Sequence, residues 1–191
     1  MKNQIVFVDQ SANADRRKVK SYYGDIDDID AAKRFGVRLY KEYSFWAWRS
    51  CAIADVAMIL KSEGLFDGTL YELVCKALQM NGYVYRNRKG KFDIGWKHNV
   101  LSKLLQSYGL KAKTVRCKNL IKIKTLLEEG KYVVLSVRSK SGGHMVLVKS
   151  IIGENIIYNN PSFFSGKGGE NILESLKSFE ERFLGRGIVA W

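Results

Sequence analysis

Residues 46–60 read Trp46-Ala47-Trp48-Arg49-Ser50-Cys51-Ala52-Ile53-Ala54-Asp55-Val56-Ala57-Met58-Ile59-Leu60, an aromatic turn that runs into an apolar helix. Ser50 is a plausible N-cap residue, and the apolar residues after it repeat at helical spacing until Glu63-Gly64. Cys51 therefore falls in the first turn of the predicted helix. The unpaired N–H groups and the positive dipole end of a helix favour a thiolate there. This position indicates a nucleophilic cysteine.

The alternative interpretation is that Cys51 is a small core residue, which is the commoner role of a cysteine on an apolar helix. Three features favour the nucleophile: the first-turn position, the tryptophans before it, and a histidine at a glycine-flanked strand start later in the chain. Cys75 and Cys117 lack all three. Because three cysteines cannot all pair and none lies in a Cys-x-x-Cys motif, the sequence predicts no disulfide framework, no metal site and no cofactor.

Two histidines could act as the base for Cys51. His144 follows Gly142-Gly143 and opens an apolar strand, a setting in which a histidine is as often structural as catalytic. His98 precedes a predicted helix among aromatic and basic residues, and we interpret it as a loop or capping residue that could line a cleft. The comparison favours His144 as the base.

An asparagine follows at the right place to orient the histidine. Asn160 precedes Pro161 and would accept the imidazole N–H through its side-chain oxygen. The same Asn-Asn-Pro-Ser residues are also strong turn formers, and both roles are compatible. Asn159 is the competing candidate, because alternation along a strand points the two side chains to opposite faces. The order Cys, His, Asn is that of papain-like nucleophilic catalysis.

The elements read from the sequence place helices first and strands afterwards. This segregation predicts an α+β fold in which the helix bearing Cys51 packs on an antiparallel sheet bearing His144, with a cleft between them. The predicted helices cover 31–35, 51–62, 69–80, 99–108 and 120–129, and the predicted strands cover 5–8, 111–116, 132–137, 144–151, 155–158 and 187–191; residues 83–97 read as a loop.

The chain of 191 residues has a formal net charge of +13, spread over several basic runs rather than gathered in one arm. A solvated surface usually explains most of such an excess of positive charge. The alternative explanation is an acidic partner, recruited by residues 86–91 and 111–124. We expect a peptide or protein substrate and no nucleic acid, since no reading motif accompanies the charge. No signal peptide or membrane span is apparent, which predicts a cytoplasmic protein, with release by another route left open.

Several motifs in a fixed order resemble the C39-like branch of papain-like cysteine peptidases, whose best-known members remove leader peptides within bacteriocin exporters. The resemblance runs from about Leu39 to the C-terminus and comprises Trp48–Ala54, Gly95–Leu101, Tyr108–Ala112, Leu126–Val134, Gly143–Val148, Tyr158–Pro161 and Phe179–Phe183. It implies a papain-like fold over 39–191. Residues 1–38 then form an N-terminal extension, a candidate pro-segment or partner-binding arm.

The resemblance also implies roles for individual residues. Cys51 is the nucleophile, His144 the base and Asn160 the residue that orients the base; Trp48 and Gly143 flank the site and are expected to bind substrate. The glycine that commonly follows the family's cysteine is Ala52 here.

The glutamine of the family's oxyanion hole has no counterpart before Cys51. Glu42 and Ser44 stand where it should lie, and an ionised carboxylate cannot donate to an oxyanion. Catalysis would then use the Cys51 backbone N–H with the Ser44 hydroxyl, a tryptophan indole N–H or a protonated Glu42. The sequence supports two hypotheses: a cysteine peptidase, and a catalytically weak domain of the same fold that binds a peptide or an acidic partner.

Overall fold

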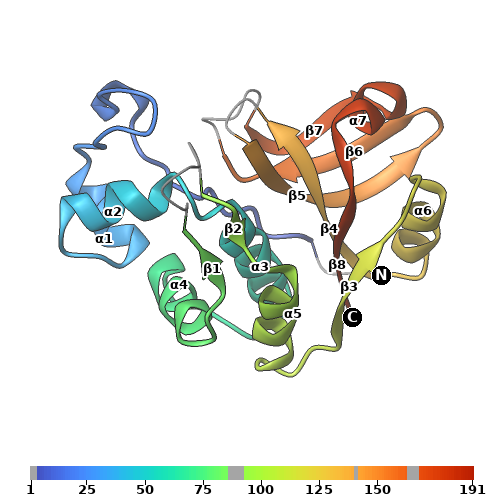
Figure 1. Ribbon diagram of the computed structural model, residues 1–191, viewed down its shortest axis with the longest axis horizontal. Helices are drawn as coiled ribbons and strands as arrows, with labels where there is room; N and C mark the ends of the chain where they lie inside the picture. The colour runs from blue at the N-terminus through green and yellow to red at the C-terminus, as the bar shows by residue number, and fades with distance from the viewer. Residues whose placement is uncertain (1–3, 86–92, 140–141, 163–167) are drawn as a thin grey trace.

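The computed structural model separates the helices from the sheet, as the order of elements predicts (Figure 1). It describes residues 4–85, 93–139, 142–162 and 168–191. One layer holds α1 (Ile29–Phe35), α2 (Tyr40–Ala47), α3 (Cys51–Ser62), α4 (Leu70–Gln79) and α5 (His98–Gln106). The other layer is an antiparallel sheet, and its far face carries α6 (Ile121–Glu128) and α7 (Leu176–Arg182).

The sheet has the strand order β3-β8-β4-β5-β6-β7 in the described part of the chain. Each neighbouring pair is antiparallel. The strands are β3 (Ala112–Arg116), β4 (Tyr132–Ser139), β5 (Gly142–Ile152), β6 (Asn155–Asn160), β7 (Gly169–Ser175) and β8 (Phe183–Ala190). The predicted α+β class is confirmed, and so is the antiparallel sheet that carries His144.

The central helix α3 is buried along almost its whole length. Its core side includes Ile53, Met58 and Leu60, each fully buried, and the helix packs on β5. Burying one such side chain stabilises the fold by roughly 1.5–3 kcal/mol. Ser50 occupies the N-cap position, but its hydroxyl donates to the Trp46 carbonyl at 2.8 Å and makes no cap bond. The helix that carries Cys51 is therefore held mainly by packing.

The N-terminal residues are packed into the same core as the rest of the chain. The predicted strand over 5–8 is wrong: this stretch is extended but pairs with no strand among the described residues. It is instead fixed by a bond from the Val6 N–H to the Ser62 hydroxyl at 2.9 Å. Ile26 and Phe35 are fully buried in the core that contains α3. Residues on both sides of the predicted boundary at residue 38 thus share one core.

Residues 83–97, predicted to be a loop, contain a short strand pair at their ends. β1 (Tyr83–Val84) pairs with β2 (Gly95–Trp96). The ring of Tyr83 packs against that of Trp96 with centroids 4.9 Å apart, and both side chains are buried. The pair lies beside the start of α3, which makes it one wall of the site described below (Figure 1).

Candidate active site

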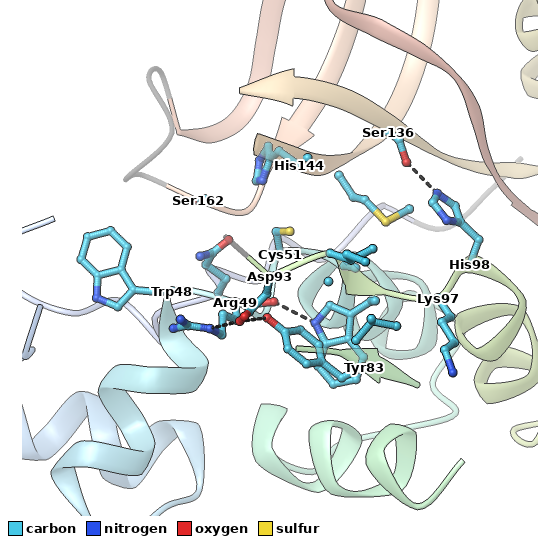
Figure 2. Close-up of a pocket in the computed structure, with 18 of the residues that line it drawn as sticks. Trp48, Arg49, Cys51, Tyr83, Asp93, Lys97, His98, Ser136, His144 and Ser162 are labelled. Atoms are coloured by element: carbon cyan, nitrogen blue, oxygen red, sulfur yellow. Dashed lines mark hydrogen bonds and ion pairs between the residues drawn. The ribbon is translucent and has the colours of Figure 1, made fainter. Parts of the chain in front are cut away.

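A cleft of about 730 Å³ opens at the N-terminal end of α3. Both Cys51 and His144 line it, one from the helix and one from β5. Figure 2 shows the Cys51 side chain turned toward the strand that carries His144. The described residues that line it are Gln10, Tyr22, Tyr23, Phe45, Trp48, Arg49, Cys51, Ala52, Tyr83, Val84, Tyr85, Asp93, Ile94, Gly95, Trp96, Lys97, His98, Ser136, Gly143, His144, Met145, Ser162, Leu184 and Arg186.

The Cys51 thiol lies among backbone N–H groups. Those of Cys51, Ala52 and Met145 favour the thiolate, and Met145 directly follows His144 on β5. Burial acts against them and is the largest effect: together with the nearby Asp55 carboxyl it raises the pKa of the Cys51 thiol to about 12. At neutral pH the resting sulfur is therefore protonated, and it lies next to the strand position of the histidine.

The His144 side chain is oriented by Asn160. Its Nε2 lies 2.8 Å from Asn160 Oδ1, and the same oxygen accepts the Ser162 backbone N–H at 3.1 Å. Because a backbone N–H can only donate, this Asn160 atom is the carbonyl oxygen, and His144 Nε2 must carry the proton. The other ring nitrogen, Nδ1, then has a lone pair that can accept a proton.

Burial also keeps the His144 ring neutral. It lowers the pKa of His144 to about 4, against the raising effect of the Asn160 hydrogen bond, and the positive charge of Arg182 lowers it further. The side chain is 7% exposed. At neutral pH the site therefore holds a thiol and a neutral imidazole, which is the protonation state that a general base needs before the reaction begins.

Asn159, the competing candidate, points elsewhere. Its amide nitrogen contacts the Met58 sulfur on α3 at 3.6 Å, and its oxygen accepts the Asn171 backbone N–H at 3.0 Å. The structure thus brings Cys51, His144 and Asn160 together and places Asn159 on the core side of β6, as strand alternation predicts.

One wall of the cleft is a polar cluster set among aromatic rings. Arg49 Nε donates to Asp93 Oδ2 at 2.7 Å, and the Tyr83 hydroxyl donates to the same oxygen at 2.8 Å (Figure 2). The Arg49 guanidinium lies 3.9 Å from the centre of the Phe45 ring. Trp96 Nε1 donates to the Arg49 carbonyl at 2.8 Å. These contacts hold the turn before Cys51 in place.

Trp48 and Gly143, predicted to bind substrate, both line the cleft. The Trp48 ring stacks on Tyr23 with centroids 5.2 Å apart, and its indole N–H donates to the Gly24 carbonyl at 2.8 Å. That N–H is already engaged, so the interpretation of a tryptophan indole as oxyanion donor finds no support at Trp48. Gly143 lies beside His144, and apart from its chain neighbours no heavy atom of the described residues lies within 4 Å of where a Cβ would be, which leaves room for a ligand.

His98 lies at the other end of the same cleft. It begins α5, and its Nε2 lies 2.6 Å from the Ser136 hydroxyl on β4 (Figure 2). Burial lowers the pKa of His98, and the nearby Arg186 lowers it further. The sequence-based interpretation of His98 as a residue near a helix start that could line a cleft agrees with this position.

Glu42 and Ser44 do not reach the cleft. The Glu42 carboxylate accepts a hydrogen bond from the Tyr71 hydroxyl on α4, and the Ser44 hydroxyl accepts the Ile26 backbone N–H at 2.9 Å. The structure therefore does not bring the two predicted oxyanion-hole residues to Cys51. Gln10 lines the cleft instead, although it was not predicted as a site residue. The sequence around it, Asp9-Gln10-Ser11, contains no motif that marks a functional glutamine.

Asp55 lies one helical turn after Cys51 and is fully buried. Burial raises the pKa of its carboxyl well above the usual range, although the Leu147 backbone N–H acts in the opposite direction. The folded protein therefore keeps a proton that the unfolded chain loses above about pH 4. Stability falls as the pH rises above that value, because ionisation then favours the unfolded chain.

Asp55→Asn is expected to raise the stability at neutral pH, because the amide has the shape of the neutral carboxyl and does not ionise. We expect a melting temperature a few degrees higher at pH 7, since about 1 kcal/mol moves Tm by roughly 2–4 °C for a chain of this size. The advantage should shrink toward pH 3. Thermal unfolding of both proteins at pH 3, 5 and 7 tests this, and a pH-independent difference would contradict it.

No protein-family model and no curated protein sequence matches the chain. Solved structures do match its fold. A protein described as a C39-like peptidase from Bacillus anthracis has a TM-score of 0.58 and 16% identity, with 75% of this chain and 88% of that chain covered. The peptidase domain of Streptococcus ComA, a bifunctional ABC transporter involved in quorum sensing, has a TM-score of 0.54 and 15% identity, covering 74% and 90%.

A third match is the double-glycine-motif protease of an AMS/PCAT transporter in complex with the leader peptide, with a TM-score of 0.50 and 17% identity, covering 73% of this chain and 82% of that one. These likenesses define the class of fold as that of papain-like cysteine peptidases. Within that class, the chain has the fold of the C39-like peptidase domains, as the motifs predicted.

Neither a membrane-spanning helix nor a metal-binding cluster is found among the described residues. None of their helices has the length and apolar character needed to cross a membrane. No group of three or more histidine, cysteine, aspartate or glutamate side chains among them is arranged to hold a metal ion.

Proposed function

We propose that the protein is a cysteine peptidase in which Cys51 is the nucleophile, His144 the general base and Asn160 the residue that orients the base. The observation that carries the proposal is the hydrogen bond between His144 Nε2 and Asn160 Oδ1, at 2.8 Å, in a cleft that also holds Cys51. It fixes the tautomer in which Nδ1 carries the lone pair that can take the thiol proton. The C39-like fold supports the same reaction class.

The reaction has two stages. Cys51 Sγ attacks the carbonyl carbon of the scissile bond while its proton moves to His144 Nδ1, and the imidazolium then protonates the leaving amine. Water hydrolyses the thioester, again with His144 as base. Because burial disfavours a charge on either residue, the proton moves as the bond forms rather than before it.

The cleft favours a peptide as substrate. Its aromatic lining, with Tyr22 and Tyr85 partly exposed, suits the apolar side chains of an extended chain. One of the structures with this fold holds a leader peptide, and we infer a peptide segment of a larger protein as the substrate here. Recruitment of an acidic partner by residues 111–124 stays a prediction. The corresponding prediction for 86–91 lies outside the described residues.

The test is a proteome-derived peptide library incubated with the purified protein, with new peptide termini identified by mass spectrometry. The unmodified protein is expected to generate a recurring cleavage motif, and Cys51→Ala is expected to generate none. A short-lived mass increase on Cys51, equal to one acyl fragment of the substrate, should appear on rapid acid quenching. Absence of new termini in every condition would contradict a peptidase.

The second hypothesis, a domain that binds a peptide without cutting it, gives a different result in the same assay. Peptides would be retained equally by the unmodified protein and by Cys51→Ala, and no new termini would form.

A further inference from the structure

The end of the cleft at His98 carries positive charge that no acidic side chain neutralises. Among the described residues, four charged ones line the cleft: Arg49, Asp93, Lys97 and Arg186. Arg49 and Asp93 form an ion pair with each other at 2.7 Å. Arg186 forms no ion pair within the described ranges. The sequence outside those ranges contains no aspartate or glutamate that could supply one.

An irregularity in the sheet brings Arg186 to this end of the cleft. The strands β4 and β8 pair at positions 135 with 187 and 137 with 183. Three residues of β8, Leu184, Gly185 and Arg186, therefore lie opposite Ser136 alone. Gly185 has a φ of 67°, in the left-handed region that favours glycine. Such bulges are common next to active sites, where they redirect a side chain, and Arg186 lines the cleft beside Ser136.

The Arg186 guanidinium is close enough to His98 to act on its charge. Burial has the largest effect in lowering the pKa of His98, and the positive charge of Arg186 lowers it further. Figure 2 shows the Lys97 side chain directed away from the His98 ring. We therefore take Arg186, rather than Lys97, as the cation of this end of the cleft.

The pair of His98 and Ser136 has one hydrogen-bond donor more than it uses. A neutral imidazole carries one N–H and a serine one O–H, and their contact at 2.6 Å uses one of the two. In one tautomer the His98 Nδ1–H is left over, and in the other the Ser136 O–H. Neither group has a further partner among the described residues. Because both residues line the cleft, a donor remains there for a ligand that brings an acceptor.

A second arginine lies directly opposite Arg186 in the sheet. Arg116 on β3 is its partner in the register of β3 and β8, and both residues are exposed. Like charges directly opposite each other on neighbouring strands are destabilising. A bound anion would offset this repulsion, so the arrangement favours a negatively charged ligand beside Arg186.

We propose that this end of the cleft is a carboxylate-binding subsite, in which Arg186 binds a carboxylate of the peptide substrate and the pair of His98 and Ser136 donates one further hydrogen bond. The proposal rests on the peptidase function proposed above and names its substrate class, a peptide with a carboxylate at a fixed distance from the cleaved bond. A planar guanidinium matches a carboxylate through two parallel hydrogen bonds. The carboxylate belongs to an acidic side chain or to the C-terminus of the peptide.

The test measures peptide binding to the Cys51→Ala protein, so that its result does not depend on cleavage. A proteome-derived peptide library is incubated with this protein, and retained peptides are identified by mass spectrometry. A retained peptide is then synthesised in matched forms, with each acidic residue replaced by its amide and with a free or amidated C-terminus. Loss of affinity in the first form identifies a side-chain carboxylate, and loss in the second identifies the C-terminal one.

The same measurements are made in Cys51→Ala proteins that also carry Arg186→Gln, Arg186→Glu or Arg116→Gln. Arg116→Gln is the matched control, because it removes the same charge from the neighbouring strand, outside the cleft lining. Both arginines are exposed, so the substitutions should leave the fold intact.

We expect the acidic peptide to bind roughly tenfold more tightly than its neutral form, and Arg186→Gln to abolish the difference. Arg186→Glu should reverse it, so that a lysine at the same peptide position is preferred. Arg116→Gln should keep the difference within about twofold.

Equal affinity of the acidic and neutral peptides for the Cys51→Ala protein would overturn the subsite, and so would an equal loss of selectivity in Arg116→Gln and Arg186→Gln. Cleavage by the unmodified protein would still support the peptidase function in both cases. Selective binding of acidic peptides with no cleavage by the unmodified protein would give the opposite result, because it supports the subsite and contradicts the peptidase.

Discussion

Cys51→Ala is expected to reduce peptide cleavage by at least about 10³-fold, because the acyl intermediate of the proposed reaction forms on the Cys51 sulfur. The loss should fall on kcat, while peptide binding survives. The melting temperature should hardly change, since Cys51 is only partly buried and alanine suits the first turn of α3. The measurement is the cleavage rate of the best library peptide, with unfolding followed in parallel.

Cys117→Ala is the matched control for this substitution. Cys117 is also a free, partly buried cysteine, but it directly follows β3 and lies outside the cleft lining. Its replacement should leave the cleavage rate within about twofold. Equal activity of the Cys51→Ala and Cys117→Ala proteins would remove Cys51 from the mechanism.

Asn160→Ala is expected to cost about 10²-fold in kcat, because the imidazole loses the acceptor that fixes its tautomer. Asn160→Asp should keep most of the activity and change its pH dependence. A carboxylate at this position favours the imidazolium and so raises the pKa of His144 from about 4. Since only the neutral ring can accept the thiol proton, the acid limb of the rate profile should move to higher pH.

The pH profile of kcat/KM for the three proteins tests this expectation. The unmodified protein should lose activity only as the pH falls toward about 4, and Asn160→Asp should lose it earlier during acidification. Asn159→Ala is the control, because Asn159 contacts Met58 and Asn171 rather than the ring. An acid limb at the same pH in the Asn160→Asp and unmodified proteins would contradict the orienting role.

The sequence predicted the elements whose residue patterns are local. The helix at Cys51 and the strand at His144 were found because their apolar residues recur at periods of 3.6 and 2. α2 was missed because its residues Tyr40–Ala47 are aromatic and weakly patterned, and its N-cap Leu39 gives no capping signal. β7 was missed because it lies at the sheet edge and most of its residues are exposed. α7 was missed because it has seven residues, of which Phe179 alone is buried, too few for a helical pattern.

The residues of the candidate site were predictable to different degrees. Cys51, His144 and Asn160 each sit at the end of a regular element, so their meeting followed from the order of elements. Gln10 could not be found in this way, because its position depends on long-range bonds to Ala47 and Pro161. Glu42 and Ser44 were chosen for their sequence distance from Cys51, but their hydrogen bonds go to Tyr71 and Ile26 instead.

The burial of Cys51 has a consequence for its life between substrates. The thiolate attacks the O–O bond of peroxide and becomes a sulfenic acid, with hydroxide as the leaving group, and the rate follows the thiolate fraction and the exposure of the sulfur. With the pKa of Cys51 raised to about 12, almost none of the resting sulfur is thiolate at neutral pH. The raised pKa that makes the nucleophile depend on His144 for activation therefore also slows its oxidation while no substrate is bound.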